Sequence, residues 1–231
     1  MDHSGVVYAR EFDGKKHNFG VVGVDEGTLI MYDEETQSRW SQLFGKAVSG
    51  KMKGAALEKL PSTMTTWAQW KALHPETTVY VKRSVPYSSR FTKETFEKAA
   101  KMAPGPVRGN DLIVGLEGHV EARAYLLRRL ADERFVEERF EGAPIAVYLS
   151  KDFSTARVYD RQIDGRALSF RLTEDEQLED AETGSRWNPI SGEALSGPLQ
   201  GKKLQSLIST FAVWFAWEHY RPDTTIHGES E

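Results

Sequence analysis

Apolar and polar residues alternate along two short stretches of the chain, and an Asp-Gly pair interrupts each stretch. The pairs are Asp13-Gly14 and Asp164-Gly165. Alternation has the two-residue period of a strand, and Asp-Gly suits the backbone conformation of a tight hairpin turn. Both stretches therefore predict β-hairpins, and the apolar run at residues 29–32 predicts a further strand.

A helical period follows in two places, where large apolar side chains recur every three residues on one face. These side chains are Trp67, Trp70 and Leu73 in the first place and Trp214, Trp217 and Tyr220 in the second. A Ser-Thr pair is the expected N-cap of each helix, and a proline followed by a short strand is expected after it. These flanking elements are Ser62-Thr63, Pro75 and residues 77–80, and Ser209-Thr210, Pro222 and residues 224–226. We expect both aromatic stripes to pack in the core rather than to stack on sugars or bases.

The middle of the chain predicts further elements. Residues 92–102 have an apolar side at helical spacing and predict an amphipathic helix, and residues 112–116 predict a strand. Residues 121–140 fit a helix by composition and a hairpin by alternation. We expect a short helix near residues 127–131, followed by a hairpin.

Residues 33–77 and 180–224 match each other without a gap, with 19 identities in 45 positions. Unrelated segments of average composition would share about three. All six tryptophans lie in the matched segments. We therefore expect an internal duplication, with a first repeat at residues 1–81, a linker at residues 82–111 and a second repeat with its lead-in strands at residues 112–231. The predicted fold class is α+β, mainly antiparallel β, with two homologous halves that each carry one Trp-rich helix.

Composition narrows the class of partner. The 231 residues carry a formal net charge of −4, which argues against general binding to nucleic acid. No stretch approaches the roughly 18 consecutive apolar residues of a membrane-spanning helix, and the N-terminal residues lack the pattern of a secretory signal. The chain has no cysteine, so disulfides, thiolate nucleophiles and cysteine-ligated metals are excluded.

The paired D-x-x-T-x-S-x-W motifs resemble a known family. Each motif is preceded by Y-x-R-x-x-D-G and followed by a W-x-x-W helix that ends at a proline. Together with residues 123–125 after residues 114–116, this pattern resembles the family catalogued as domain of unknown function 3179, over essentially the whole chain. Leu126 stands where that family usually has proline. The resemblance implies no activity and no catalytic residue.

The resemblance also implies a segment like residues 112–157 ahead of the first Y-x-R-x-x-D-G, commonly ending in C-P-L-C. Seven residues precede Tyr8, so we expect a shortened member or a fragment that lacks this segment and its cysteine pair. The first hairpin should then expose an unpaired edge, through which a partner protein or a second copy would bind. A cytoplasmic location is expected for a complete chain, whereas a fragment of a longer exported protein would leave the location undetermined.

The polar residues of the two motifs form the candidate ligand-binding site. Its expected members are Asp33, Ser38, Arg39, Arg123, Asp180, Ser185 and Arg186. Two such sets at the junction of the halves would line one pocket and bind an anion through their arginines. The other interpretation is structural and is favoured, because turn chemistry accounts for the spacing on its own: aspartate and threonine close a turn, and serine and arginine satisfy neighbouring groups.

Signals for catalysis and for cofactors are absent from the local sequence. The six histidines form no H-x-x-x-H or H-x-H spacing, so no metal and no cofactor are expected, although a metal site assembled from distant residues stays open. The predicted function is a non-catalytic module that binds a small ligand, an anion or a protein partner. The alternative is an enzyme or a metal or redox protein, with a site at the junction formed by Arg123, Asp33, Asp180 and the repeated arginines.

Overall fold

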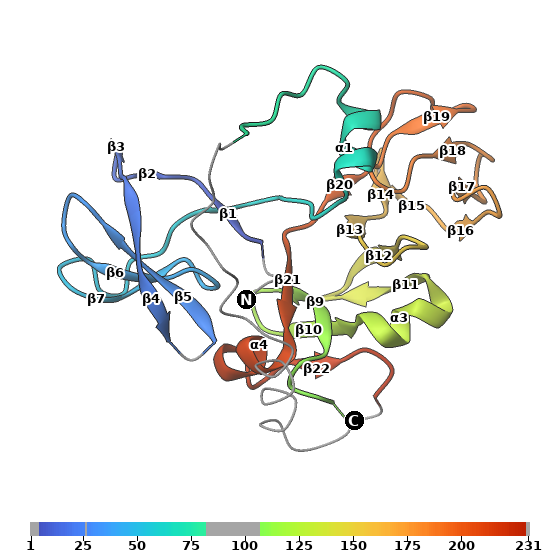
Figure 1. Cartoon of the computed structure of the whole chain (residues 1–231). Coiled ribbons are helices and arrows are strands. Elements are labelled where there is room, and N and C mark those ends of the chain that lie inside the picture. The colour runs from blue at the N-terminus through green and yellow to red at the C-terminus, as the bar shows by residue number, and fades with distance from the viewer. Residues whose placement is uncertain (1–4, 26, 82–106, 230–231) are drawn as a thin grey trace. The chain divides into compact units, whose positions relative to one another are not determined.

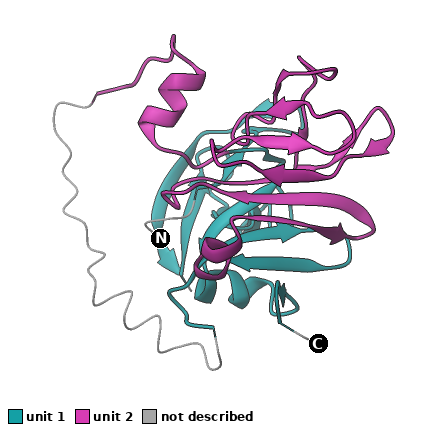
Figure 2. Cartoon of the chain, turned by 90° about the vertical axis from the view of Figure 1, so that its right-hand side faces the viewer, with its two compact units in different colours: residues 1–62, 91–126, 208–231 teal, residues 63–90, 127–207 magenta. Residues whose placement is uncertain are grey.

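The computed structural model describes residues 5–25, 27–81 and 107–229 (Figure 1). The chain forms two compact units, each assembled from separate stretches of sequence (Figure 2). Unit 1 takes residues 1–62, 91–126 and 208–231, and unit 2 takes residues 63–90 and 127–207. Each unit thus contains residues from both predicted repeats. None of the described helices is long and apolar enough to cross a membrane.

The first sheet of unit 1 is an antiparallel meander in the order β4-β5-β6-β7. Its strands are β4 (Phe19–Asp25), β5 (Thr28–Asp33), β6 (Arg39–Ser41) and β7 (Lys46–Ser49). Strand β5 confirms the strand predicted at residues 29–32. Trp40 on β6 is fully buried and packs with Ala47 and Leu57 in the core of this sheet.

Two pairs of short strands accompany this sheet in unit 1. The strands β2 (Glu11–Phe12) and β3 (Lys15–Lys16) form the first predicted hairpin. Asp13 and Gly14 have φ of 49° and 68°, as a two-residue hairpin turn of this type requires. The strand β1 (Val7–Tyr8) pairs with β8 (Lys59–Leu60) in antiparallel fashion.

The second sheet of unit 1 joins residues that are far apart in the sequence, in the order β21-β9-β10-β22. Its strands are β9 (Leu112–Glu117), β10 (Ala122–Leu126), β21 (Ser209–Val213) and β22 (Thr225–Ile226). Strands β9 and β10 form an antiparallel hairpin, β21 is antiparallel to β9, and β22 is parallel to β10. Helix α4 (Trp214–Tyr220) connects β21 to β22 and packs Trp214 and Trp217 into the core beside Ile113 and Leu126.

Unit 2 also contains two four-stranded antiparallel sheets, in the orders β11-β12-β13-β20 and β16-β17-β18-β19. Their strands are β11 (Phe135–Phe140), β12 (Ala143–Leu149), β13 (Ala156–Asp160), β20 (Gln205–Ser206), β16 (Phe170–Leu172), β17 (Leu178–Asp180), β18 (Arg186–Trp187) and β19 (Ala194–Ser196). The second predicted hairpin is formed by β14 (Gln162–Ile163) and β15 (Arg166–Ala167). Helix α3 (Leu127–Glu133) precedes the β11–β12 hairpin, which confirms the prediction for this region. The fold is therefore mainly antiparallel β with short helices.

The two Trp-rich helices have the same local structure and a different burial. Helix α1 (Trp67–Leu73) and helix α4 each span seven residues, and in both the second tryptophan donates its indole N–H to a threonine seven residues later. In α4, Trp214 and Trp217 are 5% and 1% exposed, whereas in α1, Trp67 and Trp70 are 50% and 36% exposed. The prediction of core packing is therefore right for α4 and wrong for α1. Helix α4 lies on the sheet that β21 and β22 enter, and among the described residues the segments on either side of α1 enter no sheet.

The predicted starts of these helices are wrong. Helix α1 has Thr66 as its N-cap, in a capping box in which Thr66 and Gln69 each accept a hydrogen bond from the backbone N–H of the other. The expected cap at residues 62–63 lies upstream of it. The expected cap at residues 209–210 lies in β21, because the ladder with β9 uses these residues as strand.

Two further predictions concern the segments after α1. Residues 77–80 form no strand, in contrast to the prediction and to β22, which follows α4. The amphipathic helix predicted at residues 92–102 lies outside the described residues.

Candidate functional site

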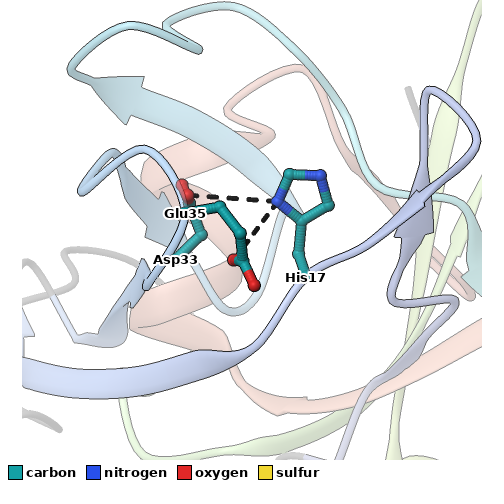
Figure 3. A group of neighbouring side chains, drawn as sticks. All are labelled: His17, Asp33 and Glu35. Atoms are coloured by element: carbon teal, nitrogen blue, oxygen red, sulfur yellow. Dashed lines mark ion pairs between the residues drawn. The ribbon is translucent and has the colours of Figure 1, made fainter.

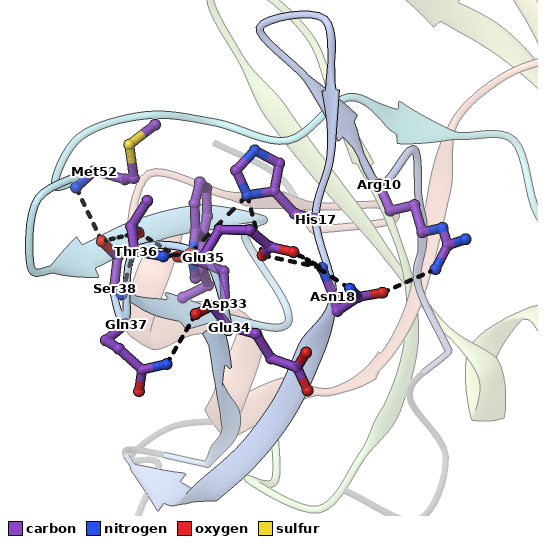
Figure 4. Close-up of polar contacts among 11 residues, drawn as sticks. Arg10, His17, Asn18, Asp33, Glu34, Glu35, Thr36, Gln37, Ser38 and Met52 are labelled. Carbon is purple, nitrogen blue, oxygen red and sulfur yellow. Dashed lines mark hydrogen bonds and ion pairs between the residues drawn. The ribbon is translucent and has the colours of Figure 1, made fainter.

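A tight turn joins β5 to β6, and its first residue, Asp33, is the centre of a buried hydrogen-bond group (Figure 4). Oδ1 of Asp33 accepts the backbone N–H of Thr36 at 2.5 Å. Oδ2 accepts the Thr36 hydroxyl and the Trp40 indole N–H, both at 2.8 Å. Burial alone would raise the pKa of Asp33, but these hydrogen bonds outweigh burial and hold the pKa below its ordinary value. The turn therefore carries a fixed negative charge.

Ser38 closes the other end of this turn. Its hydroxyl oxygen lies 2.7 Å from that of Thr36 and accepts the backbone N–H of Met52 at 3.0 Å (Figure 4). Gly50 passes close behind it with φ of 88°, and a Cβ at Gly50 would lie 2.7 Å from the Ser38 Cα. Ser38 thus ties the turn to the loop after β7.

The turn between β17 and β18 has matching contacts. Thr183 donates its backbone N–H and its hydroxyl to Asp180, and the Trp187 indole donates to Oδ2 of Asp180 at 2.9 Å. The Ser185 hydroxyl lies 2.6 Å from that of Thr183 and accepts the backbone N–H of Leu199 at 3.1 Å. Of the predicted site residues, Asp33, Ser38, Asp180 and Ser185 are each engaged in closing their own turn.

A histidine lies beside the first turn. His17, between β3 and β4, is 5% exposed, and its Nδ1 lies 3.5 Å from Oε2 of Glu35 and 4.0 Å from Oδ1 of Asp33 (Figure 3). This Nδ1 is buried and makes no hydrogen bond to any described residue. The imidazole packs edge-on against Phe12, with 5.8 Å between ring centroids. Leu168 takes the matching position before β16 and lies in the apolar core.

Glu35 is held in place by Asn18. The backbone N–H of Asn18 donates to both carboxylate oxygens at 3.1 Å, and its side-chain amide donates to Oε1 at 3.3 Å (Figure 4). The backbone N–H of Ser169 holds Glu182 beside the second turn in the same way. The Glu35 side chain is 34% exposed, so the group opens to solvent on this side.

The three predicted arginines do not join the turns. Arg39 on β6 is exposed and lines a surface pocket together with Val24 and Ile30. Arg123 on β10 pairs with Glu121 at 3.2 Å, and Arg186 pairs with Asp175 at 2.5 Å. Arg39 and Arg123 belong to unit 1 and Arg186 belongs to unit 2. An anion site at the junction of the halves therefore stays a prediction.

The group around His17 has the chemistry of a cation site. Two carboxylates face one imidazole nitrogen, and this charge would repel an anion placed among them. His17 and Glu35 are the site residues that the sequence reasoning missed, since His17 lies 16 residues before Asp33 and forms no local metal motif. The signal that could have found it is an imidazole at the position where the second repeat has Leu168.

Comparison with known proteins identifies a family without an activity. The family described as "Protein of unknown function (DUF3179)" matches residues 1–224 of the chain. No curated protein and no solved structure matches the chain.

Proposed function

We propose that the protein is a non-catalytic interaction module, and that its partner adds a β-hairpin to the first repeat. The chain belongs to the DUF3179 family, whose description states no activity. The observation that carries this proposal is the different burial of α1 and α4. Trp67 and Trp70 are 50% and 36% exposed, whereas their counterparts Trp214 and Trp217 are buried.

The comparison of the two helices rests on an internal duplication, which we include in the proposal. The 19 identities in 45 positions support it, as do the matching hydrogen bonds of the Asp33 and Asp180 turns. Tyr8 and Tyr159 provide a further match, because each hydroxyl lies within hydrogen-bonding distance of two successive backbone carbonyls, in the loop after β6 for Tyr8 and after β18 for Tyr159. Helices α1 and α4 then have a common origin, and a difference in what covers them has a local cause.

The cover of α4 is the β9–β10 hairpin. This hairpin lies between β21 and β22, which are the segments on either side of α4. Trp217 packs on β9 at Gly115, where a Cβ would lie 2.4 Å from the indole ring. A hairpin with a glycine under the second tryptophan is therefore what buries a helix of this type.

The first repeat presents the same receptor without a hairpin among the described residues. Residues 61–66 and 74–81, on either side of α1, form no strand, and Val79, Tyr80 and Val81 are exposed. Segments that form no strand and expose apolar side chains are suited to the addition of strands from a partner. Among the described strands β1 pairs with β8 alone, whereas β13 lies between β12 and β20, which supports a second open edge in this repeat.

Other readings remain predictions. A second copy of the chain is one source of the hairpin, as expected for a homo-oligomer through the first-repeat edge. An anion bound by the arginines, and an enzyme with a site at the junction of the halves, are favoured by none of the contacts described above.

The chain's own hairpin provides the probe for a test. A synthetic peptide of residues 111–127 is added to the full chain, and amide hydrogen exchange is measured at residues 61–66 and 74–81. We expect saturable protection of both segments and a blue shift of tryptophan emission. The matched controls are the Trp70→Ala chain, which removes the receptor, and a Gly115→Val peptide, whose side chain would meet the indole.

The outcomes separate the alternatives. No protection at millimolar peptide, or equal protection with both controls, would contradict the proposal. Light scattering on the chain alone addresses the second copy, because a dimer with the same two segments protected would identify the partner as this protein itself.

A further inference from the structure

His17 is not needed to build the turn that it faces. The Asp180 turn has the same hydrogen bonds from threonine and tryptophan, and it has Leu168 in place of a histidine. The backbone N–H of each residue donates to the carbonyl of an arginine seven residues earlier, so the two positions also agree in backbone structure. The imidazole therefore adds a polar atom to a place that an apolar side chain fills equally well.

That polar atom is costly as it stands. Nδ1 of His17 is buried without a hydrogen bond to any described residue, and an unsatisfied buried polar group destabilises the folded state. It is aimed at Oδ1 of Asp33 and Oε2 of Glu35, and the three atoms lie within 4.8 Å of one another (Figure 3). Both neighbours of Nδ1 are carboxylate oxygens, and Nδ1 is hydrogen-bonded to neither of them.

The two carboxylates are fixed before any ligand arrives. Thr36 and Trp40 hold Asp33, and the backbone N–H of Asn18 holds Glu35. A carboxylate oxygen has two lone pairs, so the oxygens that accept these hydrogen bonds retain capacity for a metal. Held carboxylates do not need to be ordered on binding, which favours affinity.

We propose that His17, Asp33 and Glu35 bind a divalent transition-metal cation, for which zinc is the best fit. One imidazole nitrogen and two carboxylate oxygens suit zinc better than magnesium or calcium, which prefer oxygen alone. Two carboxylates and a neutral imidazole also balance a charge of +2. This site is independent of the interaction surface at α1.

The distances are close to those of a zinc site. Bonds of about 2.0–2.1 Å in a tetrahedron place ligand atoms roughly 3.3 Å apart. The 3.5 Å from Nδ1 to Glu35 is near this value, whereas the 4.0 Å from Nδ1 to Asp33 is longer and the two carboxylate oxygens lie within 4.8 Å of each other, so the side chains would draw closer on binding. Glu35 is the partly exposed member, so the ion would enter from its side, and water would complete the coordination.

Zinc titration of the full chain by calorimetry tests the proposal, with native mass spectrometry for stoichiometry. We expect one zinc per chain, a rise in melting temperature on binding, and weaker binding of magnesium. His17→Leu copies the second repeat and should keep the fold, as judged by circular dichroism. Loss of a neighbour of a metal ligand typically lowers affinity about 10–100-fold, so loss of the His17 ligand should lower it by more than about 100-fold.

Matched variants separate this site from surface binding. Glu35→Gln should weaken zinc binding, whereas Glu182→Gln, at the equivalent place in the second repeat, should leave it unchanged. Equal zinc affinity in the chain and in the His17→Leu variant would overturn the proposal, as would the absence of saturable binding at micromolar zinc. Protonation of His17 Nδ1 at neutral pH in the presence of zinc, observed by ¹⁵N NMR, would show that a proton takes the site instead and would also overturn it.

Discussion

Replacement of the second tryptophan of α1 and of α4 by alanine should have very different effects on stability. Trp217 is 1% exposed and Trp70 is 36% exposed. A tryptophan has roughly 250 Å² to bury, so this difference of 35 percentage points corresponds to about 90 Å². At about 25 cal/mol per Å², that area is worth roughly 2 kcal/mol.

A cavity adds to the difference. Trp217 sits among buried neighbours on Gly115, so Trp217→Ala leaves a void, and such truncations cost about 3–5 kcal/mol. Trp70 faces solvent, so Trp70→Ala leaves no enclosed void. We expect a loss of about 4 kcal/mol for Trp217→Ala, and a loss at least about 2 kcal/mol smaller for Trp70→Ala.

Urea denaturation of the two full-length variants measures these losses. Trp217 belongs to unit 1 and Trp70 belongs to unit 2. Hydrogen exchange at β9 and at β12 should therefore be measured together with urea denaturation, so that unfolding of unit 1 is distinguished from unfolding of unit 2. Equal losses, or a larger loss for Trp70→Ala, would refute the reasoning, because α1 would then be covered as α4 is.

Two further predictions concern unit 2. In urea denaturation, Gly197→Ala should destabilise unit 2 by about 1–3 kcal/mol more than Gly201→Ala. Both glycines have positive φ, but a Cβ at Gly197 would lie 2.7 Å from the Ser185 Cα, whereas a Cβ at Gly201 would meet nothing within 4 Å. Equal losses of stability would count against the contact with Ser185. The Arg134 guanidinium donates a hydrogen bond to Glu176 and, against the effect of burial, holds the pKa of that carboxyl below its ordinary value. The stabilisation of the folded state by this ion pair is therefore present above the unfolded pKa of Glu176 and is lost as pH falls through the lower folded pKa. In the Glu176→Gln variant, the free energy of unfolding should therefore fall less steeply below about pH 5, by less than about 1 kcal/mol because the ion pair is partly exposed. An unchanged dependence of this free energy on pH would contradict the role given to Glu176.

Local chemistry made the hairpins and turns predictable. In Asp13-Gly14 and in Asp164-Gly165 both residues have positive φ. Aspartate and glycine adopt this conformation more readily than most residues, so the residue types alone predict the turn. Asp33 and Thr36 likewise close their turn with side chains three residues apart. Such features need no information from distant parts of the chain.

Long-range pairing accounts for most of what the sequence did not reveal. Residues 209–210 look like a helix cap, but β9, about a hundred residues earlier, pairs with them as strand. The same sheet determines that Trp217 is buried, while nothing in the W-x-x-W spacing distinguishes it from Trp70. The pattern predicts the face of a helix, and the residues that cover this face come from elsewhere.

The cation site escaped prediction for a related reason. His17 joins Asp33 and Glu35 only because β4 and β5 are paired, which brings Phe19 opposite Asp33. The two predicted hairpins contained a signal, because His17 and Leu168 each lie three residues after the glycine of the Asp-Gly pair. A polar residue at an apolar position of a repeat is worth examining even when no motif surrounds it.

The interleaving of the chain also constrains the order in which it folds during synthesis. Unit 2 is complete once residue 207 has left the ribosome, whereas unit 1 still requires β21, α4 and β22. The β4-β5-β6-β7 sheet and the short strand pairs beside it lie within residues 7–60 and can form early, whereas the β9–β10 hairpin stays open on both edges until β21 and β22 emerge. During translation this hairpin therefore exposes two unpaired strand edges, which favour aggregation.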